Sequence, residues 1–401
     1  MRMTTSCRNV LNRLSVALQL RLIWLPVLCL VTLVLIPVTI STRLNLLAYD
    51  LLSQALTKTE RPVDSVVIAI DEASLKQFGA WPWSRQRQAD LLALLLKAES
   101  GPVAFAILFS SEGPQSAGDD AFAQQIARSP AIVLSVAPAQ PSDGAGIFAL
   151  RPLEKLLGNA SEGHVDVEVD ADGMTRRVFL KAGVEGQWWS ALALATQMQM
   201  RDFTPLSLRG RSAPALSSRA GVWQRDGELM IRNDLVGQIP IVSYSDVLVG
   251  ALSDEALRGK AVFVGVTATG INGKLAIANS KDGNLVSAVE YQARTFEALR
   301  QGAVLTPVDR VSSLLIGLGL LLVVAFASRH TTYHWSLLLL TFALLPAAIS
   351  FGLIHSLGIW APPIEATFAL SVLALCMLWR QMSDFEEADS LLRKRNQVAM
   401  E

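Results

Sequence analysis

Residues 65–84 read SVVIAIDEASLKQFGAWPWS, and they combine a buried strand with the start of a helix. Ser65–Ile70 is a short, uncharged run rich in β-branched residues, which is typical of a buried strand. Asp71 follows at once, and an aspartate in this position can cap a helix by accepting a backbone N–H. A strand that leads straight into a helix indicates a βαβ unit, so this stretch predicts an α/β domain with a parallel sheet.

The segments that follow repeat this alternation of strands and helices. We expect further strands at Val103–Phe109, Ala131–Ala137 and Ala261–Val266, and helices from Ser84 to about Glu99, from Asp119 or Asp120 to Ala127, near Trp188–Met200 and over Val286–Arg300. A β-hairpin is expected from Val165–Val169 and Arg176–Lys181, which flank the turn Asp170-Ala171-Asp172-Gly173. Residues 138–147 and 203–222 are predicted loops. The pattern therefore predicts a mixed sheet with flanking helices.

Apolar residues gather at the two ends of the chain. The chain is 51% hydrophobic and 17% charged, against roughly 25% charged in an average protein. A membrane-spanning helix needs about 20 apolar residues, and runs of about this length lie at 22–40, 311–328, 335–354 and 364–380. A cleaved signal peptide is the alternative for the first run, but the run is long and lacks a small-x-small cleavage site. We expect four transmembrane helices, one N-terminal and three C-terminal.

The placement of basic residues predicts the orientation in the lipid bilayer. All nine Lys and Arg residues outside 41–310 fall on one side of a four-span arrangement, and this side should be cytoplasmic. Residues 41–310 carry 29 acidic and 26 basic side chains, a net charge of −3. We therefore expect a multi-pass protein of the cell inner membrane, with 41–310 extracytoplasmic and with 1–21 and 381–401 cytoplasmic. The formal net charge of zero gives no indication of nucleic-acid binding.

Cysteine and histidine are too sparse in residues 41–310 to suggest a metal site. The three cysteines are Cys7, Cys29 and Cys376, and none forms a CxxC or zinc pattern. His164 is the only histidine of residues 41–310. We expect neither a metal nor a cofactor.

A set of short motifs, in a fixed order, resembles the CHASE type-2 domain, the cyclase/histidine-kinase-associated sensory extracellular domain. The motifs are Asp71-Glu72-Ala73-Ser74-Leu75, Gly79-Ala80-Trp81-Pro82-Trp83-Ser84-Arg85, Ile107-Leu108-Phe109-Ser110, Asp119-Asp120, Gly163-His164-Val165, Asp170-Ala171-Asp172-Gly173 with Arg176-Arg177, Leu257-Arg258-Gly259-Lys260 with Phe263-Val264-Gly265, and Val289-Glu290. They cover about residues 45–305. The resemblance implies a sensory domain followed by three spans, and receptors of this kind place a kinase, cyclase or nucleotide-synthesising domain after them.

The sequence departs from this family pattern at two points. Ala106 stands where the family often has an acidic residue before its Ile-Leu-Phe run. Gly270-Ile271-Asn272-Gly273 stands where the family has Gly-x-x-Asp, so Gly273 replaces the acid. If these acids serve a binding pocket in the family, the pocket of this chain should differ or be lost.

Four residues are candidates for ligand binding, each beside a structural alternative. Asp71 could bind a cationic group, but the N-cap of the first helix is the alternative we favour. Trp81 and Trp83 could stack on a ligand, although packing of the first helix against the sheet is favoured. Arg85 could clamp an anion, or it could be solvated or ion-paired.

The C-terminal segment completes the functional prediction. The polar tail 381–401 is expected to be helical, and Phe385 and Leu392 lie seven residues apart, on one seam of a possible homodimer. No catalytic constellation is recognisable, and we expect a sensor rather than an enzyme. It would detect an unknown small-molecule or envelope signal and act on a cyclase or kinase output beyond Glu401 or on a cytoplasmic signalling partner. The alternative is a non-signalling, membrane-anchored envelope scaffold that binds a partner protein.

Overall fold

The computed structural model describes residues 38–56, 61–113, 116–129, 131–142, 146–200, 210–212, 221–271, 273–278, 285–327 and 343–398. The chain divides into two compact units. Ser53–Pro307 forms the central unit, and the terminal unit combines Met1–Leu52 with Val308–Glu401.

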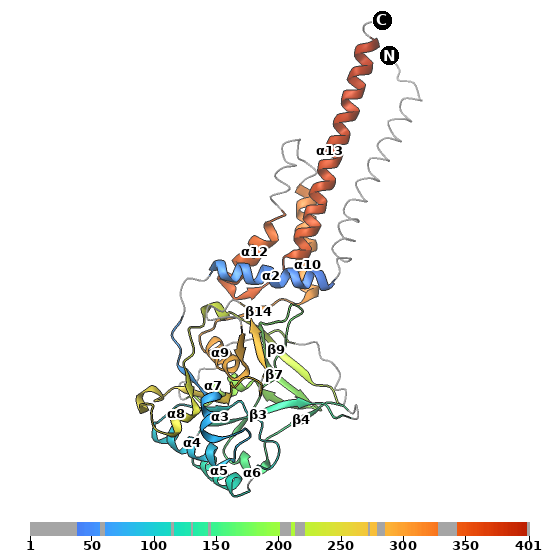
Figure 1. Cartoon of the computed structure of the whole chain (residues 1–401). Coiled ribbons are helices and arrows are strands. Elements are labelled where there is room, and N and C mark those ends of the chain that lie inside the picture. The colour runs from blue at the N-terminus through green and yellow to red at the C-terminus, as the bar shows by residue number, and fades with distance from the viewer. Residues whose placement is uncertain are drawn as a thin grey trace. The chain divides into compact units, whose positions relative to one another are not determined.

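A mostly parallel sheet forms the middle of the central unit (Figure 1). Its strands run in the order β10-β1-β11-β2-β3-β4, and β5 also pairs with β3. The strands are β1 (Ser65–Ile70), β2 (Val103–Phe105), β3 (Ile132–Ala139), β4 (Phe148–Leu150), β5 (Ser161–His164), β10 (Ile241–Ser243) and β11 (Ala261–Val266). All the pairings are parallel except that of β3 with β4. The predicted parallel sheet is confirmed.

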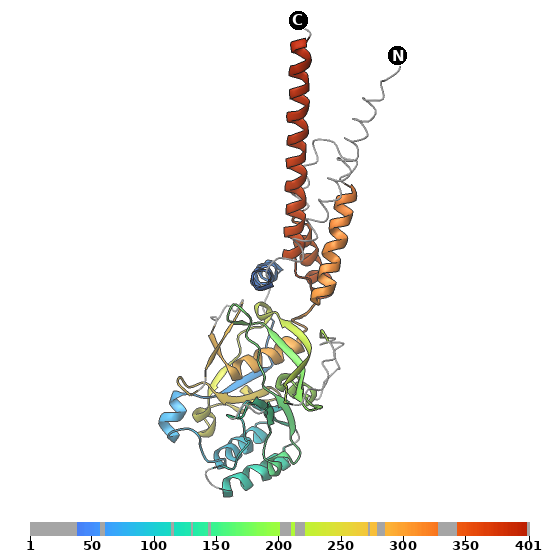
Figure 2. The same cartoon turned by 90° about the vertical axis from the view of Figure 1, so that its right-hand side faces the viewer.

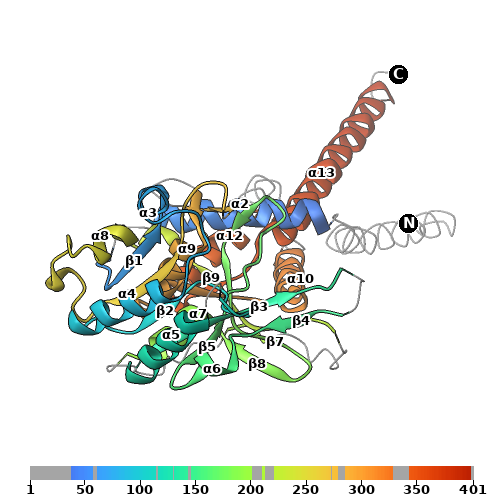
Figure 3. The ribbon, with the colours of Figure 1, turned by 60° about the horizontal axis from the view of Figure 1, so that its bottom comes forward.

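Helices cover both faces of this sheet and bury two separate cores. The helices of the central unit are α3 (Glu72–Phe78), α4 (Gln86–Lys97), α5 (Ser116–Arg128), α6 (Glu154–Leu157), α7 (Leu192–Met198), α8 (Tyr244–Leu248) and α9 (Ala288–Arg300). Alternate residues of a strand face opposite sides of a sheet. Val66 and Ile68 accordingly join a core with α4, α5 and α8, whereas Val67 and Ala69 join a core with α7 and α9. Figure 3 shows α4 and α5 together on their face.

Two smaller sheets complete the central unit. In one, β14 (Val304–Pro307), β9 (Gln224–Ile231), β7 (Arg177–Val184) and β8 (Gln187–Ser190) pair antiparallel in this order. In the other, β12 (Lys274–Ile277) lies between β13 (Leu285–Ser287) and β6 (Met174–Thr175).

The terminal unit is helical. Its helices are α2 (Val38–Leu56), whose last turn belongs to the central unit, α10 (Arg310–Ala327), α12 (Leu345–Leu357) and α13 (Ile364–Val398), and it also contains the short strand β15 (Ile359–Trp360). Helices α10 and α13 run side by side (Figure 2), and leucines such as Leu321 and Leu373 pack between them. Asn45 of α2 binds the start of α13: its amide nitrogen donates to Glu365 Oε2 and its oxygen accepts the N–H of Ile364, both at 3.0 Å.

The predicted membrane spans are only partly covered by the described residues. Most of the span at 22–40 lies outside them, as do residues 335–342 of the third span. In the parts of the chain that the structure describes, no helix combines the length and the apolar character needed to cross a membrane. The predicted tail is helical as far as Val398, because α13 continues through it without a break.

Several predicted boundaries were wrong. The strand that begins at Val103 ends at Phe105 rather than at Phe109. Ala106 N still donates a hydrogen bond to Val264 O of β11, and the chain then leaves the sheet. Helix α4 begins at Gln86 rather than at Ser84, with Arg85 at the N-cap position, and Ser84 Oγ accepts the Gln86 N–H at 3.4 Å. The third helix begins earlier than predicted, at Ser116.

The region around the predicted hairpin also differs from expectation. The turn is confirmed, since Gly173 N donates to Asp170 O at 2.9 Å. Val165–Val169, however, is not a strand and contributes only the single bridge between Glu168 and Arg177. The helix predicted near Trp188–Met200 begins at Leu192, because both tryptophans before it belong to β8 and pair with β7. Likewise the last helix begins at Ala288, because Leu285–Ser287 forms β13.

Candidate functional site

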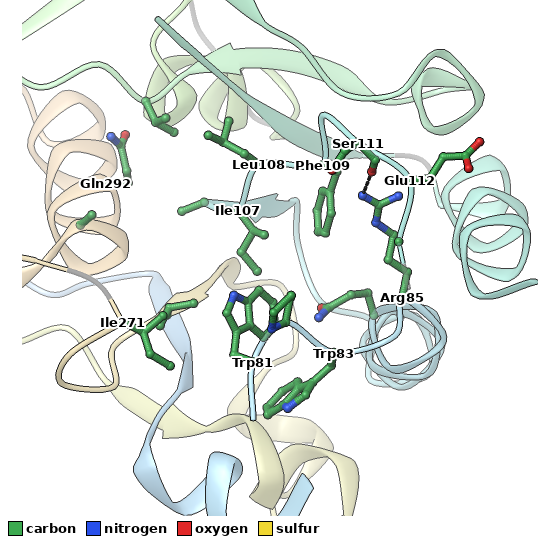
Figure 4. A pocket seen from close by; sticks show the side chains of 17 residues that line it. Trp81, Trp83, Arg85, Ile107, Leu108, Phe109, Ser111, Glu112, Ile271 and Gln292 are labelled. Carbon is green, nitrogen blue, oxygen red and sulfur yellow. Dashed lines mark hydrogen bonds between the residues drawn. The ribbon is translucent and has the colours of Figure 1, made fainter. Parts of the chain in front are cut away.

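A cavity of about 530 Å³ opens at the carboxyl ends of the parallel strands (Figure 4). Its walls come from the Trp81–Trp83 segment, helix α4, the segment Ala106–Gly113 that follows β2, and the start of α9. Val266 at the end of β11 also contributes. In open α/β sheets, ligands bind outside the carboxyl ends of the strands. Position and size therefore both favour this cavity as the candidate site, because ligand pockets measure about 300–1,000 Å³.

Asp71 serves as the N-cap of α3, as predicted. Its Oδ1 accepts hydrogen bonds from Ser74 N at 2.9 Å, Ser74 Oγ at 2.6 Å and Ser243 Oγ at 2.9 Å. These bonds hold the end of β1, the start of α3 and the end of β10 together. Asp71 does not line the cavity, so its position supports the cap rather than a ligand contact.

Trp83 and Trp81 occupy different environments although they are two residues apart. Trp83 is 6% exposed, and its indole N–H donates to the carbonyl of Gly79 at 2.8 Å. Its ring meets Phe78, Trp81 and Tyr244 with centroids 5.2–5.5 Å apart. Trp81 is only half-buried and lines the cavity. Packing therefore accounts for Trp83, whereas Trp81 has ring surface that a ligand can cover.

Arg85 is ion-paired and removed from solvent. Its Nη1 donates to Asp119 Oδ1 at 2.7 Å, and its Nη2 donates to the carbonyl of Ser111. The guanidinium carbon also lies 5.3 Å from the centroid of the Phe109 ring. Of the two structural alternatives, solvated and ion-paired, the ion pair is the one observed. The charge of Arg85 is thus already compensated before any ligand enters the cavity.

Asp119 holds this arrangement from helix α5 and is fully buried. Its second oxygen accepts the N–H of Gly113 at 3.1 Å and lies 3.3 Å from Lys155 Nζ. Burial alone would raise the pKa of Asp119, but the hydrogen bonds from Gly113 and Arg85 and the charge of Arg85 outweigh it, so the pKa lies below its ordinary value. The carboxylate is therefore charged at neutral pH and fixes the loop beside the cavity.

Gln88 is the buried polar side chain of the cavity wall that lacks a full set of partners. It lines the cavity and is 1% exposed. The Tyr244 hydroxyl donates to the carbonyl of Arg87 at 2.8 Å and also lies 3.2 Å from Gln88 Oε1. Gln88 Nε2 has no hydrogen-bond partner among the described residues. Gln292 of α9 is a second carboxamide in the wall, 5% exposed. The cavity wall thus contains two buried carboxamides.

Gln88 is not among the predicted site residues, although its position in the sequence indicates a buried polar side chain. It lies three and four residues before Leu91 and Leu92, on the apolar stripe that α4 turns to the core. A polar residue within such a stripe is unusual, because its side chain then needs hydrogen-bond partners inside the core. The sequence could thus have indicated Gln88, but not that its side-chain nitrogen has no partner among the described residues.

The two departures from the family pattern lie at or beside the cavity. Ala106 is part of the cavity wall, and so is Ile271 from the loop that ends at Gly273. With alanine and isoleucine at these places, the wall between β2 and the start of α9 is apolar, continued by Val165 and Ala288. That the pocket differs from the family's where the acids are missing stays a prediction.

A metal site is not indicated by the described residues, among which no three His, Cys, Asp or Glu side chains are grouped to hold an ion. His164 is buried, and one of its ring nitrogens, Nε2, lies 3.0 Å from the carbonyl of Phe179. Burial is the main cause that lowers the pKa of His164 to about 4. Glu290 forms a salt bridge with Arg294, whose Nε lies 3.4 Å from its Oε1.

Comparison with known protein families agrees with the fold and with the ordered motifs. The sequence model of the CHASE2 domain matches residues 26–327, about three quarters of the chain. Comparison with curated proteins and with solved structures gave no match. CHASE2 domains are extracellular sensory domains. The chain belongs to the CHASE2 domain family.

Proposed function

We propose that this protein is a membrane receptor whose CHASE2 domain detects a small molecule in the cavity and passes the signal through its helices to a cytoplasmic output of the cyclase or kinase class. The observation that carries the proposal is the cavity itself. It lies where α/β sheets bind ligands, and its walls combine aromatic rings with two buried carboxamides. No catalytic role is proposed for any residue of the described chain.

The cavity is well placed for a ligand to change the packing of the domain. Its walls belong to both cores, since Ile107 and Phe109 pack with one core while Ala106 packs against the other. A ligand that touches these residues contacts elements on both faces of the sheet at once. A ligand can shift a conformational equilibrium only if it binds one state better, and a site between two packed layers offers such differential contacts.

The proposed route to the cytoplasm runs through the terminal unit. Asn45 ties α2 to the start of α13, and α13 then continues for 35 residues. Phe385 and Leu392 are exposed near its end and are spaced for a seam between two copies of the helix. We include a homodimer in the proposal for this reason, because C2 dimers are the commonest oligomers.

Membrane attachment rests on the sequence pattern: four apolar runs, and nine basic residues on one side. A reporter that is active only in the cytoplasm tests it. Fused after Glu401, the reporter should be active, and inserted at Ser142 it should be silent. The reverse result would contradict the proposed orientation.

The cavity is tested by filling it. We expect Ala106→Phe to block the site, while Ala127→Phe, at an exposed position of α5 outside the cavity, serves as the matched control. The full chain is fused to a cyclase output, and reporter activity is compared in fresh medium and in medium conditioned by growing cells. The wild type and Ala127→Phe should respond to the change of medium, and Ala106→Phe should not. Equal responses from all three would place the sensed ligand elsewhere, and no response from any would favour the envelope scaffold.

A further inference from the structure

We propose that helix α2 lies on the extracytoplasmic surface of the bilayer, where one apolar face of the helix contacts lipid. The residues of this face, called the α2 stripe, are Ile40, Leu44, Leu47 and Leu51. The inference rests on the proposed membrane receptor and goes beyond it by assigning a partner to a face of α2. Three observations support it: the burial pattern of α2, its attachment to α13, and the place where two predicted spans end.

The exposed face of α2 is apolar, whereas its buried face is partly polar. The four residues of the α2 stripe are 43–59% exposed, and their spacing of four, three and four residues places them on one side of the helix. The buried face combines Leu46 and Tyr49 with the polar Ser41 and Asn45. A helix on the surface of a soluble protein turns its apolar stripe inward and its polar face to water. The distribution in α2 therefore favours an apolar medium beside the stripe.

Helix α2 crosses the start of α13. Asn45, near the middle of α2, binds Ile364 and Glu365, the first two residues of α13. Tyr49, one turn further along, meets the ring of Trp360 edge to face, with centroids 5.4 Å apart. Figures 1 and 2 show α2 lying across α13 rather than along it. Asn45 and Tyr49 lie on the side of α2 opposite the stripe, so the stripe faces away from α13.

Two predicted membrane boundaries meet at α2. The apolar run 22–40 ends at Ile40, the first residue of the stripe, and the run 364–380 begins at Ile364, which is bonded to Asn45. In the proposed orientation both of these ends lie on the extracytoplasmic side. A helix that crosses the start of a span at this level runs along the bilayer surface. Such helices bury their apolar face at the boundary between headgroups and acyl chains.

The charges of α2 indicate that apolar contact, rather than charge, holds the stripe in lipid. The helix carries one basic and one acidic side chain, Arg43 and Asp50, which balance each other. Arg43 is exposed beside the stripe, where a long side chain can keep its charge among the headgroups. We therefore expect α2 to contact zwitterionic and anionic lipid alike.

Fluorescence quenching by lipid tests the proposal on the full chain in phosphatidylcholine vesicles. A bimane label is attached to one introduced cysteine at a time, with the three native cysteines replaced by serine. The vesicles contain lipid with a nitroxide quencher either at the headgroup or near the end of an acyl chain. Leu47→Cys tests the stripe, Leu322→Cys in α10 is the control for the span 311–328, and Val249→Cys at the end of α8 is the control for water. The native residues are similarly exposed, at 54%, 54% and 60%.

We expect a different result at each position. The headgroup quencher should lower the fluorescence of Leu47→Cys more than the acyl-chain quencher does, the order should reverse for Leu322→Cys, and neither should affect Val249→Cys. Leu51→Cys should follow Leu47→Cys. Ala48→Cys, turned by about 100° from Leu47 on the same helix, should lose less fluorescence than Leu47→Cys. Adding anionic phosphatidylglycerol should leave this pattern unchanged.

The outcomes separate this inference from the proposed function. Quenching of Leu322→Cys without quenching of Leu47→Cys would overturn the inference and leave the membrane receptor in place. A disulfide that joins Leu47→Cys of two chains, without quenching, would mean that a second copy covers the stripe. Equal quenching of Leu47→Cys and Ala48→Cys, or quenching that requires phosphatidylglycerol, would also overturn the role of the stripe. An unquenched Leu322→Cys would count against the proposed membrane attachment itself.

Discussion

Arg85 holds its guanidinium 2.7 Å from the carboxylate of Asp119, and both side chains are buried. This pair joins the start of α4 to α5 and closes one side of the cavity. A buried ion pair loses more when one partner is removed than when both are replaced, because a single removal leaves an uncompensated charge. The buried ion pair therefore predicts a loss of stability on replacement of either partner, which a solvated arginine would not show.

Each single replacement, Arg85→Met or Asp119→Leu, is expected to lower the free energy of unfolding by about 3–5 kcal/mol. The double variant should lose less than the sum of the two single losses, because no charge then remains buried without a partner. Denaturant unfolding followed by tryptophan fluorescence measures all three. An unchanged stability of Arg85→Met would contradict the structural role and would favour Arg85 as an anion clamp.

The two neighbouring tryptophans should respond differently to truncation. Trp83→Ala removes a buried ring and is expected to cost about 3–5 kcal/mol of stability. Trp81→Ala removes a half-buried ring, and a loss below about 2 kcal/mol is expected because less apolar surface becomes exposed. Thermal melting of the full chain compares them. If Trp83→Ala left the melting temperature unchanged while reporter response was lost, Trp83 would be a ligand contact and not a packing residue.

Acidification should destabilise the protein through His164. Burial lowers the pKa of His164 to about 4 from an ordinary 6.5, so the folded protein keeps this side chain neutral. Between pH 6.5 and pH 4 the unfolded chain binds a proton that the folded chain does not, and stability falls as pH falls through this window. The loss from this group should reach about 2 kcal/mol at pH 5.

The matched control for this pH dependence is His164→Gln, which keeps an N–H for the carbonyl of Phe179 but does not titrate. Unfolding free energies of the variant and the wild type are measured at several pH values from 7 to 5. The wild type should lose stability more steeply than the variant. Parallel curves would show that the pKa of His164 in the folded protein lies near its ordinary value.

Signal transmission through α13 should depend on helical phase. Helix α13 extends to Val398 without interruption, so an output domain fused after Glu401 is expected to follow its rotation. Deleting one residue between Met382 and Arg395 turns everything beyond it by about 100°, whereas deleting seven changes the phase by only about 20°. Reporter activity should change with one deletion and largely recover with seven. A flat series, with expression and membrane insertion verified, would indicate a passive tether.

The sequence predicted best those elements whose causes are local. Ser65–Ile70 and Ala261–Val266 were placed correctly because each is an uncharged run buried on both faces. The N-cap role of Asp71 follows from its place between strand and helix. Strand β8 was mistaken for helix because Trp188 and Trp189 are fixed by pairing with β7, which no local pattern reveals.

The candidate site was only partly predictable for the same reason. Trp81 and Arg85 belong to one contiguous motif that the sequence singles out, and both line the cavity. The partner of Arg85 comes from α5, 34 residues away, and that of Gln88 comes from α8. Whether a polar atom has a hydrogen-bond partner depends on such distant contacts, which neither spacing nor composition reveals.

The most direct measurement of the central claim fills the cavity in the full chain fused to a cyclase output. The account predicts that the wild type and Ala127→Phe respond to medium conditioned by growing cells and that Ala106→Phe, expressed at the same level, does not. A response of Ala106→Phe equal to that of the wild type would contradict it.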